Sequence, residues 1–93
     1  MKMKQFIAEI EHNKIGVIKY YLVKTFKDDY PGVELYGIGI YEDKSGKYTC
    51  VENVDINKER IEKFILCLRD GIVTGTTLKE LCEDYVEMLT DRS

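Results

Sequence analysis

The sequence contains no tryptophan, one proline and one histidine among its 93 residues. It also has no uninterrupted apolar run of the roughly 18 residues that indicate a membrane-spanning helix. The N-terminal segment reaches a charged residue, Glu9, before the apolar core of a signal peptide could form. These absences predict a protein without a membrane partner, and the default expectation is a cytoplasmic location.

Cysteine and histidine are too few and too scattered for a disulfide framework or a metal site. The three cysteines are Cys50, Cys67 and Cys82, and no two of them form a Cys-x-x-Cys pair. His12, the one histidine, falls among polar residues in a predicted turn. We therefore expect no metal and no cofactor, and we expect the thiols to serve as small buried hydrophobic groups.

The charge balance argues against a nucleic-acid partner. The formal net charge is −3, whereas binding to phosphates needs a surplus of lysine and arginine on one face. The seven tyrosines could stack on bases if they lay on a sheet surface, but strand propensity and half-burial explain them more simply. We expect the partner to be a protein or a small ligand.

No constellation of residues supports catalysis. The stretch Gly37-Ile38-Gly39 lacks the third glycine and the following helix of a dinucleotide-binding loop. Asp43-Lys44-Ser45-Gly46 lacks the regular ligand spacing of a calcium loop and is typical of a hairpin turn. No serine or cysteine is placed beside a histidine by the sequence. The sequence therefore predicts that the protein is not an enzyme.

The first half of the chain has the alternation of strands. Alternating and β-branched residues predict four strands, at about residues 4–11, 15–26, 33–42 and 47–54. Turn signals separate them: His12-Asn13-Lys14, then Pro31-Gly32 at the centre of a type II turn, then Gly46. Short connections of this kind favour an antiparallel meander.

The second half has the period of helices. Ile61, Phe64, Ile65 and Leu68 lie on one helical face, which predicts a helix at about 58–70 with Asn57 as N-cap and Gly71 as its stop. Thr77 and Glu80 form a capping box, which predicts a second helix at about 78–90. The alternative, one long helix with a kink at 71–76, is less consistent with Gly75 and the β-branched pair Val73-Thr74.

Together these elements predict a single domain, residues 1–93, of the α+β class: a four-stranded antiparallel meander followed by two helices packed on one face of the sheet. Even-numbered positions are the more apolar in the first three strands, so we assign them to the helices. They are Phe6, Ala8, Ile10, Ile18, Tyr20, Leu22, Tyr36, Ile38 and Ile40. The fourth strand leaves its facing open.

The opposite, outer face of this sheet is the candidate interface. Gly37 and Gly39 leave a bare strip that suits a covering aromatic ring or another chain. The candidate residues are Ile7, Val17, Tyr21, Val23, Leu35, Gly37, Gly39 and Tyr41. A contiguous apolar patch suggests an interface, so the leading hypothesis is a protein-interaction module that self-associates as a homodimer through this face. The alternative is a binder of a small molecule or peptide that uses the glycine strip as a groove.

The second predicted helix carries one acidic stripe. Its members are Glu80, Glu83, Asp84, Glu87 and Asp91. Such a stripe is either a solvent-facing side of the helix or a docking surface for a basic protein partner.

The stretch from Tyr36 to Tyr85 resembles a family of short bacterial proteins of unknown function. The resemblance rests on Tyr36-Gly37-Ile38-x-Ile40, Val54-x-Ile56, Val73-Thr74 and the helix containing Leu78 and Glu83-Asp84-Tyr85. Gly39 departs from the family pattern, in which a charged residue often holds this position. The resemblance implies a shared fold and no particular activity.

Overall fold

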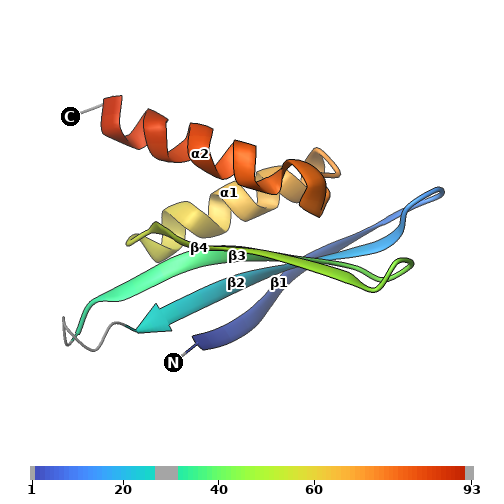
Figure 1. The fold of residues 1–93 in the computed structure, drawn as a ribbon, viewed down its shortest axis with the longest axis horizontal. Coiled ribbons are helices and arrows are strands. Elements are labelled where there is room, and N and C mark those ends of the chain that lie inside the picture. Colours follow the sequence, from blue (N-terminus) through green and yellow to red (C-terminus); the bar gives the residue numbers. More distant parts are fainter. Residues whose placement is uncertain (1, 27–31, 92–93) are drawn as a thin grey trace.

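The computed structural model describes residues 2–26 and 32–91, the last two of these by backbone alone. The strands are β1 (Lys2–His12), β2 (Gly16–Phe26), β3 (Glu34–Glu42) and β4 (Lys47–Asp55), and the helices are α1 (Lys58–Asp70) and α2 (Gly75–Asp91). The strands form one antiparallel sheet in the order β1-β2-β3-β4, and both helices lie on the same side of it (Figure 1). The predicted α+β meander followed by two helices is confirmed. The predicted turn at Pro31 lies outside the described residues.

The core lies between the sheet and the two helices. Even-numbered residues of β2 and β3 are almost completely buried there, as predicted, and they meet Ile61, Ile65 and Leu68 of α1 and Leu78 and Cys82 of α2. The strand residues in this cluster are Ile18, Tyr20, Leu22, Tyr36, Ile38 and Ile40. Each helix carries an apolar stripe that follows its 3.6-residue period. It buries this stripe on the one sheet face that the 2-residue alternation of the strands makes apolar.

A bulge in β1 changes which residues of that strand face the helices. Phe6 pairs with Tyr21 and Ala8 pairs with Tyr20, so Ile7 is an extra residue in β1. The even positions after the bulge face the helices, but Phe6 shares the outer face with Tyr21. Ile7 is half-buried and packs against the core cluster. The prediction was therefore wrong for both Phe6 and Ile7, because alternation was assumed to continue through the bulge.

A larger irregularity in β4 settles which way that strand faces. Thr49 and Val51 lie opposite inward-facing residues of β3, whereas Cys50 lies opposite Gly39 on the outer face. The register then jumps, so that Glu52, Asn53 and Val54 together occupy the space opposite one residue, Gly37. Asn53 adopts a left-handed φ of 58°, which asparagine tolerates better than most residues. After the jump, Val54 and Asp55 are buried on the helix side.

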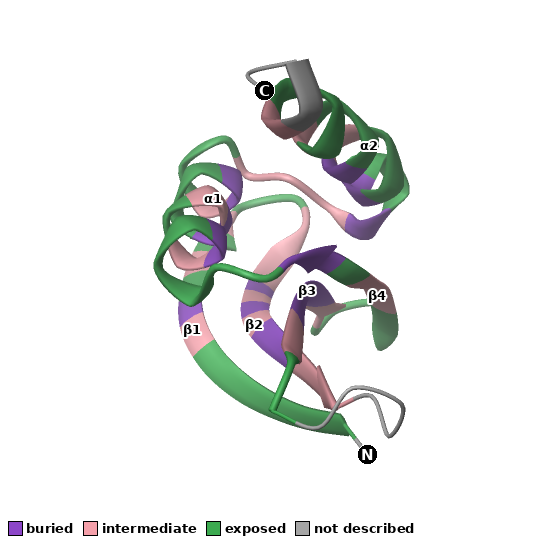
Figure 2. Ribbon diagram, turned by 90° about the vertical axis from the view of Figure 1, so that its left-hand side faces the viewer, coloured by how far each residue is buried: buried purple, intermediate pink, exposed green. Residues whose placement is uncertain are grey.

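The sheet is strongly curled, and its N-terminal end passes under the outer face. In Figure 2 the exposed part of β1 sweeps beneath the other strands toward the β4 side of the sheet. Lys2 forms an ion pair with Glu52 of β4. The Lys4 ammonium lies 4.6 Å from the ring centre of Tyr21 and 5.0 Å from that of Tyr48. The first strand therefore covers part of a face that the meander alone would leave open.

The helix ends differ from the predicted ones in two places. Asn57 caps α1 by accepting a hydrogen bond from the backbone N–H of Arg60 (3.0 Å), as predicted. The left-handed residue after α1 is Ile72 (φ 53°), not Gly71, and Val73 N–H bonds back to the Leu68 carbonyl at 3.0 Å. Helix α2 begins at Gly75, two residues before Thr77, so the predicted capping box at Thr77 is wrong.

Candidate functional site: a groove between β4 and α2

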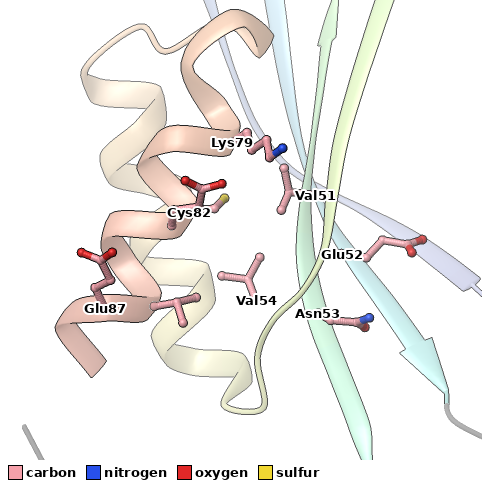
Figure 3. A pocket seen from close by; sticks show the side chains of 9 residues that line it. Val51, Glu52, Asn53, Val54, Lys79, Cys82 and Glu87 are labelled. Atoms are coloured by element: carbon pink, nitrogen blue, oxygen red, sulfur yellow. The ribbon is translucent and has the colours of Figure 1, made fainter. Parts of the chain in front are cut away.

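A groove of about 460 Å³ runs between β4 and α2. Figure 3 shows Val51 and Val54 projecting from β4 toward α2, and Cys82 projecting back from the helix. Lys79, Glu83, Val86 and Glu87 complete the helical wall. The side chains of Glu52 and Asn53 point away from the helix at the open border of the groove. The floor is apolar and the helical rim is charged.

Two contacts, one at each end, fix the position of α2 beside β4. At the first end Gly75 is packed so closely on Thr49 that a Cβ on the glycine would come within 3.0 Å of the threonine side chain. At the other end the Tyr85 hydroxyl donates a hydrogen bond of 2.5 Å to Asp55. The helix and the strand therefore run in the same direction. The groove lies beside this stretch and continues along α2 past Tyr85 to Val86 and Glu87.

Asp55 is the polar anchor of this arrangement. It is 6% exposed and accepts two hydrogen bonds of 2.7 Å from the Arg60 guanidinium, in addition to the bonds from Tyr85 and from Asn57 N–H (3.1 Å). Arg60, by its hydrogen bonds, holds the pKa of the Asp55 carboxyl well below its usual range. Burial raises the pKa of Tyr85 to about 12, so the phenol stays protonated and keeps donating. One carboxylate thus joins β4, α1 and α2.

The stacked pair of Phe64 and Tyr85 supports the anchor from the apolar side. Their ring centres are 4.3 Å apart and their planes differ by 11°. The aromatic contact orients Tyr85, whose hydroxyl is then aimed at Asp55.

The predicted acidic stripe is exposed in the described part of α2, but only half of it borders the groove. Glu80, Glu83, Asp84 and Glu87 are exposed, and the side chain of Asp91 lies outside the described residues. Glu83 and Glu87 line the groove, and Lys79 is the one basic residue of its lining. Lys79 stands near Val51 (Figure 3), whereas Glu83 and Glu87 follow one and two turns later along the helix. The rim is acidic over most of its length.

The outer face contains less free apolar surface than the sequence suggested. Tyr48 lies over Gly39, where a Cβ would come within 3.0 Å of its ring, and the β4 backbone at Val51 and Glu52 lies over Gly37. Both glycines are buried, and Val23 is 3% exposed. Val17, Tyr21, Leu35 and Tyr41 are half-buried. The bare strip is therefore filled by the same chain and is not an open groove.

An aromatic cluster closes this outer face. The rings of Phe6 and Tyr21 meet edge to face at 5.8 Å, and those of Tyr21 and Tyr48 at 6.5 Å. Lys4 lies over Tyr21 and Tyr48 and adds a cation–π contact with each. Burial raises the pKa of Tyr48 to about 12. The cluster covers part of the outer face, while Phe6 and Tyr48 themselves remain 49% and 44% exposed.

The residues considered for chemistry are dispersed. Among the described residues there is no group of three or more histidine, cysteine, aspartate or glutamate side chains that could hold a metal ion. Burial raises the pKa of the Cys82 thiol to about 11, and it also raises the pKa of Cys50. Cys67 is exposed on α1, contrary to the expectation that all three thiols are buried. None of the described helices is long and apolar enough to cross a bilayer.

Sequence reasoning missed the groove, although one signal for it was present. Leu78, Leu81, Cys82, Tyr85 and Leu89 form one apolar stripe along α2 at helical spacing. Val86, four residues after Cys82, is not part of that stripe. It adds apolar surface on the side of the helix next to β4. The β4 half of the groove could not be anticipated, because it depends on the register jump at Glu52–Val54.

The fold and the groove define a small α+β domain in which one sheet carries two helices on a single face. The chain belongs to a family of unknown function, DUF6514, whose family model matches residues 3–88. No curated protein and no solved structure matches the chain significantly. The family match covers nearly all of the chain.

Proposed function

We propose that this protein is a non-catalytic protein-interaction module, and that the groove between β4 and α2 binds an extended segment of a partner that is both apolar and basic. The observation that carries the proposal is the coincidence, in one place, of a free sheet edge, an apolar floor and an acidic rim. Each of the three selects one property of the partner.

The free edge selects an extended segment. Strand β4 is the last strand of the sheet, so one side of its backbone pairs with no other strand in the described residues. The regular part of this edge, up to Val51, offers main-chain hydrogen bonds to an incoming strand, whereas the irregular stretch Glu52–Val54 interrupts the ladder. Helix α2 overhangs the same edge and would cover the added strand.

The floor selects apolar side chains. Val51 and Val54 come from β4, and Cys82 and Val86 from α2. A volume of about 460 Å³ accommodates several side chains at the alternate positions of an added strand. Val86 is 41% exposed in the free protein, so binding would remove it from water.

The rim selects positive charge. Glu83 and Glu87 are exposed along two successive turns of α2, and Lys79 is the one lysine or arginine among the groove residues. Complementary charges on a partner would speed the encounter and exclude acidic segments. This agrees with the second of the two interpretations of the acidic stripe, a docking surface for a basic protein partner.

The outer face has less in its favour as the binding surface. Its glycine strip is filled by Tyr48 and by the β4 backbone, and Val23 is buried. An interface there would have to use half-buried residues such as Leu35 and Tyr41. The two less exposed thiols, Cys50 and Cys82, do not favour an enzymatic role, because burial raises their pKa values and disfavours the nucleophilic thiolate.

The test is a titration with a short synthetic peptide of alternating valine and lysine, blocked at both ends. Fluorescence anisotropy of the labelled peptide should show saturable binding to the wild-type protein, and Val86→Glu should weaken it at least about tenfold (about 1.4 kcal/mol). Met88→Glu, on the same helix but outside the groove lining and 59% exposed, is the matched control and should bind normally. A peptide of alternating valine and glutamate should not bind. Equal binding by the two variants would contradict the proposal.

A further inference from the structure

We infer that the extended segment which occupies the groove is β1 of a second copy of this chain, so that molecules associate head to tail. The inference rests on the proposed function, because it names the occupant of the same groove. It is carried by the chemistry of the opposite edge of the sheet.

Strand β1 has the properties that the groove selects. It is the other edge strand, and all of its residues from Lys2 to Phe6 are exposed. Two of them are lysines, Lys2 and Lys4, and two are large and apolar, with Met3 54% and Phe6 49% exposed. This stretch contains no acidic residue. It is an extended, basic and apolar segment already held in the strand conformation, so little conformational entropy is lost when it adds to another sheet.

The two surfaces are compatible in charge within a single molecule. Lys2 pairs with Glu52 at the border of the groove. Lys2, Lys4 and Phe6 lie on one side of β1, opposite Met3. A β1 strand from another molecule with this side turned toward α2 would bring the same kind of ammonium group to Glu83 and Glu87, which are exposed on the helical rim, in exchange for the contacts that Lys2 and Lys4 make in their own molecule. The chain therefore provides both members of a complementary pair of surfaces.

Charge also disfavours two of the possible symmetric contacts. Two grooves that met across Glu83 and Glu87 would bring these acids against their own copies, and two β1 edges that met across Lys2 and Lys4 would bring the lysines against theirs. Both arrangements are repulsive, whereas a β1 edge against a groove is attractive. The contact then joins two different surfaces. Such a contact can repeat from one molecule to the next, whereas the contact in a two-fold dimer is complete after two molecules.

This arrangement predicts open-ended association. The average mass should rise steadily with concentration between about 10 μM and 1 mM, the range of a weak complex, without a plateau at a dimer. Raising the salt concentration from about 0.05 M to 0.5 M should reduce the mass, because the contact depends on charges near the surface.

Two variants separate the two halves of the contact. Met3→Glu places a carboxylate in the β1 edge, and Val86→Glu places one in the floor of the groove. Each variant alone should be monomeric by sedimentation or light scattering over the same range, with a circular dichroism spectrum like that of the wild type. Val33→Glu and Met88→Glu replace residues that are 43% and 59% exposed and serve as controls, and both should associate like the wild type.

Mixing the two monomeric variants gives the sharpest result. The Val86→Glu protein keeps a native β1, and the Met3→Glu protein keeps a native groove. They should therefore form a one-to-one complex that does not grow. If Met3→Glu alone still associates, the contact does not use β1 and the inference is wrong. If the wild type is monomeric up to about 1 mM, the inference is also wrong.

The outcomes for the occupant and for the groove are independent. A wild-type monomer that still binds the valine–lysine peptide through Val86 would overturn the second-copy inference and leave the proposed function in place. A protein that neither associates nor binds the peptide would overturn both. Association lost on Leu35→Glu but kept in Met3→Glu and Val86→Glu would return the interface to the outer face.

Discussion

The hydroxyl of Tyr85 on α2 donates a hydrogen bond of 2.5 Å to a carboxylate oxygen of Asp55 on β4, 30 residues earlier in the chain. This bond ties the helix to the strand just beyond Val54, the last β4 residue of the groove. The Arg60 guanidinium and the Asn57 backbone N–H donate the other hydrogen bonds to the Asp55 carboxylate, so both of its oxygens have partners. One buried acid therefore holds this end of α2 beside β4, while the packing of Gly75 on Thr49 holds the other end.

Removing the Tyr85 hydroxyl should destabilise the fold measurably. Tyr85→Phe keeps the stacking on Phe64 but deletes one hydrogen bond to a charged group, which should lower the free energy of unfolding by about 1–2 kcal/mol. Urea denaturation followed by circular dichroism measures this. Tyr41→Phe is the control, because the Tyr41 hydroxyl makes no hydrogen bond within the described residues, and it should be near neutral. Equal stability of the two variants would contradict the role of Asp55 as the anchor.

The same carboxylate should govern the stability of the protein in acid. The pKa of Asp55 is lower in the folded protein than the value of about 3.9 for an unfolded chain. Its contribution is therefore fully present above about pH 4 and is lost as the pH falls through the lower folded value, because unfolding then takes up a proton. Asp55→Asn should be less stable than the wild type at neutral pH, and its free energy of unfolding should fall less steeply below pH 4. If the free energies of unfolding of the two proteins fall equally steeply below pH 4, this assignment is contradicted.

The two glycines of β3 should differ in their tolerance of a methyl group. Gly37→Ala would drive its Cβ into the β4 backbone at Val51 and Glu52, which cannot move without disturbing the register jump. Gly39→Ala would meet only the tip of the Tyr48 ring, a side chain that is 44% exposed and can swing outward. We expect the loss of stability to be greater for Gly37→Ala, by about 1–3 kcal/mol. A double-mutant cycle adds the control, since Tyr48→Ala should cancel most of the cost of Gly39→Ala but none of that of Gly37→Ala.

The three cysteines should react with a thiol reagent at separate rates. Cys67 is exposed and should react within the first phase in the folded protein. Cys82 is 2% exposed and its pKa is raised to about 11, so it should react only on unfolding. Cys50 should also be slow, because burial raises its pKa. Labelling with mass-spectrometric identification of the modified peptides tests the order, and early labelling of Cys82 would mean that α2 does not stay packed on β4.

The architecture could be predicted from the sequence because it depends on regular periods. The spacing of Ile61, Ile65 and Leu68 is sufficient for α1, and the alternation of Ile18, Tyr20 and Leu22 is sufficient for the facing of β2. The failures occur where a period is interrupted. The bulge at Ile7 places Phe6 on the outer face. No local residue preference indicates a bulge at an isoleucine, so the sequence alone does not predict it.

The candidate site was less predictable for the same reason. The sequence correctly placed Gly37 and Gly39 on one outward side and suggested a covering ring, and Tyr48 is that ring for Gly39. It could not show that β4 itself covers Gly37, because the close approach follows from the pairing of distant segments. The groove arises from the same irregularity, which turns Val54 toward Cys82 and Val86.

The location of partner binding tests the central claim most directly. Amide chemical shifts of the isotopically labelled protein should be recorded during a titration with the valine–lysine peptide. The account predicts that the largest changes lie at Val51–Val54 and Lys79–Glu87, with amide protons of β4 gaining protection from exchange as a strand adds to the edge. Changes centred instead on Tyr21, Tyr41 and Tyr48 would place the binding surface on the outer face and contradict the account.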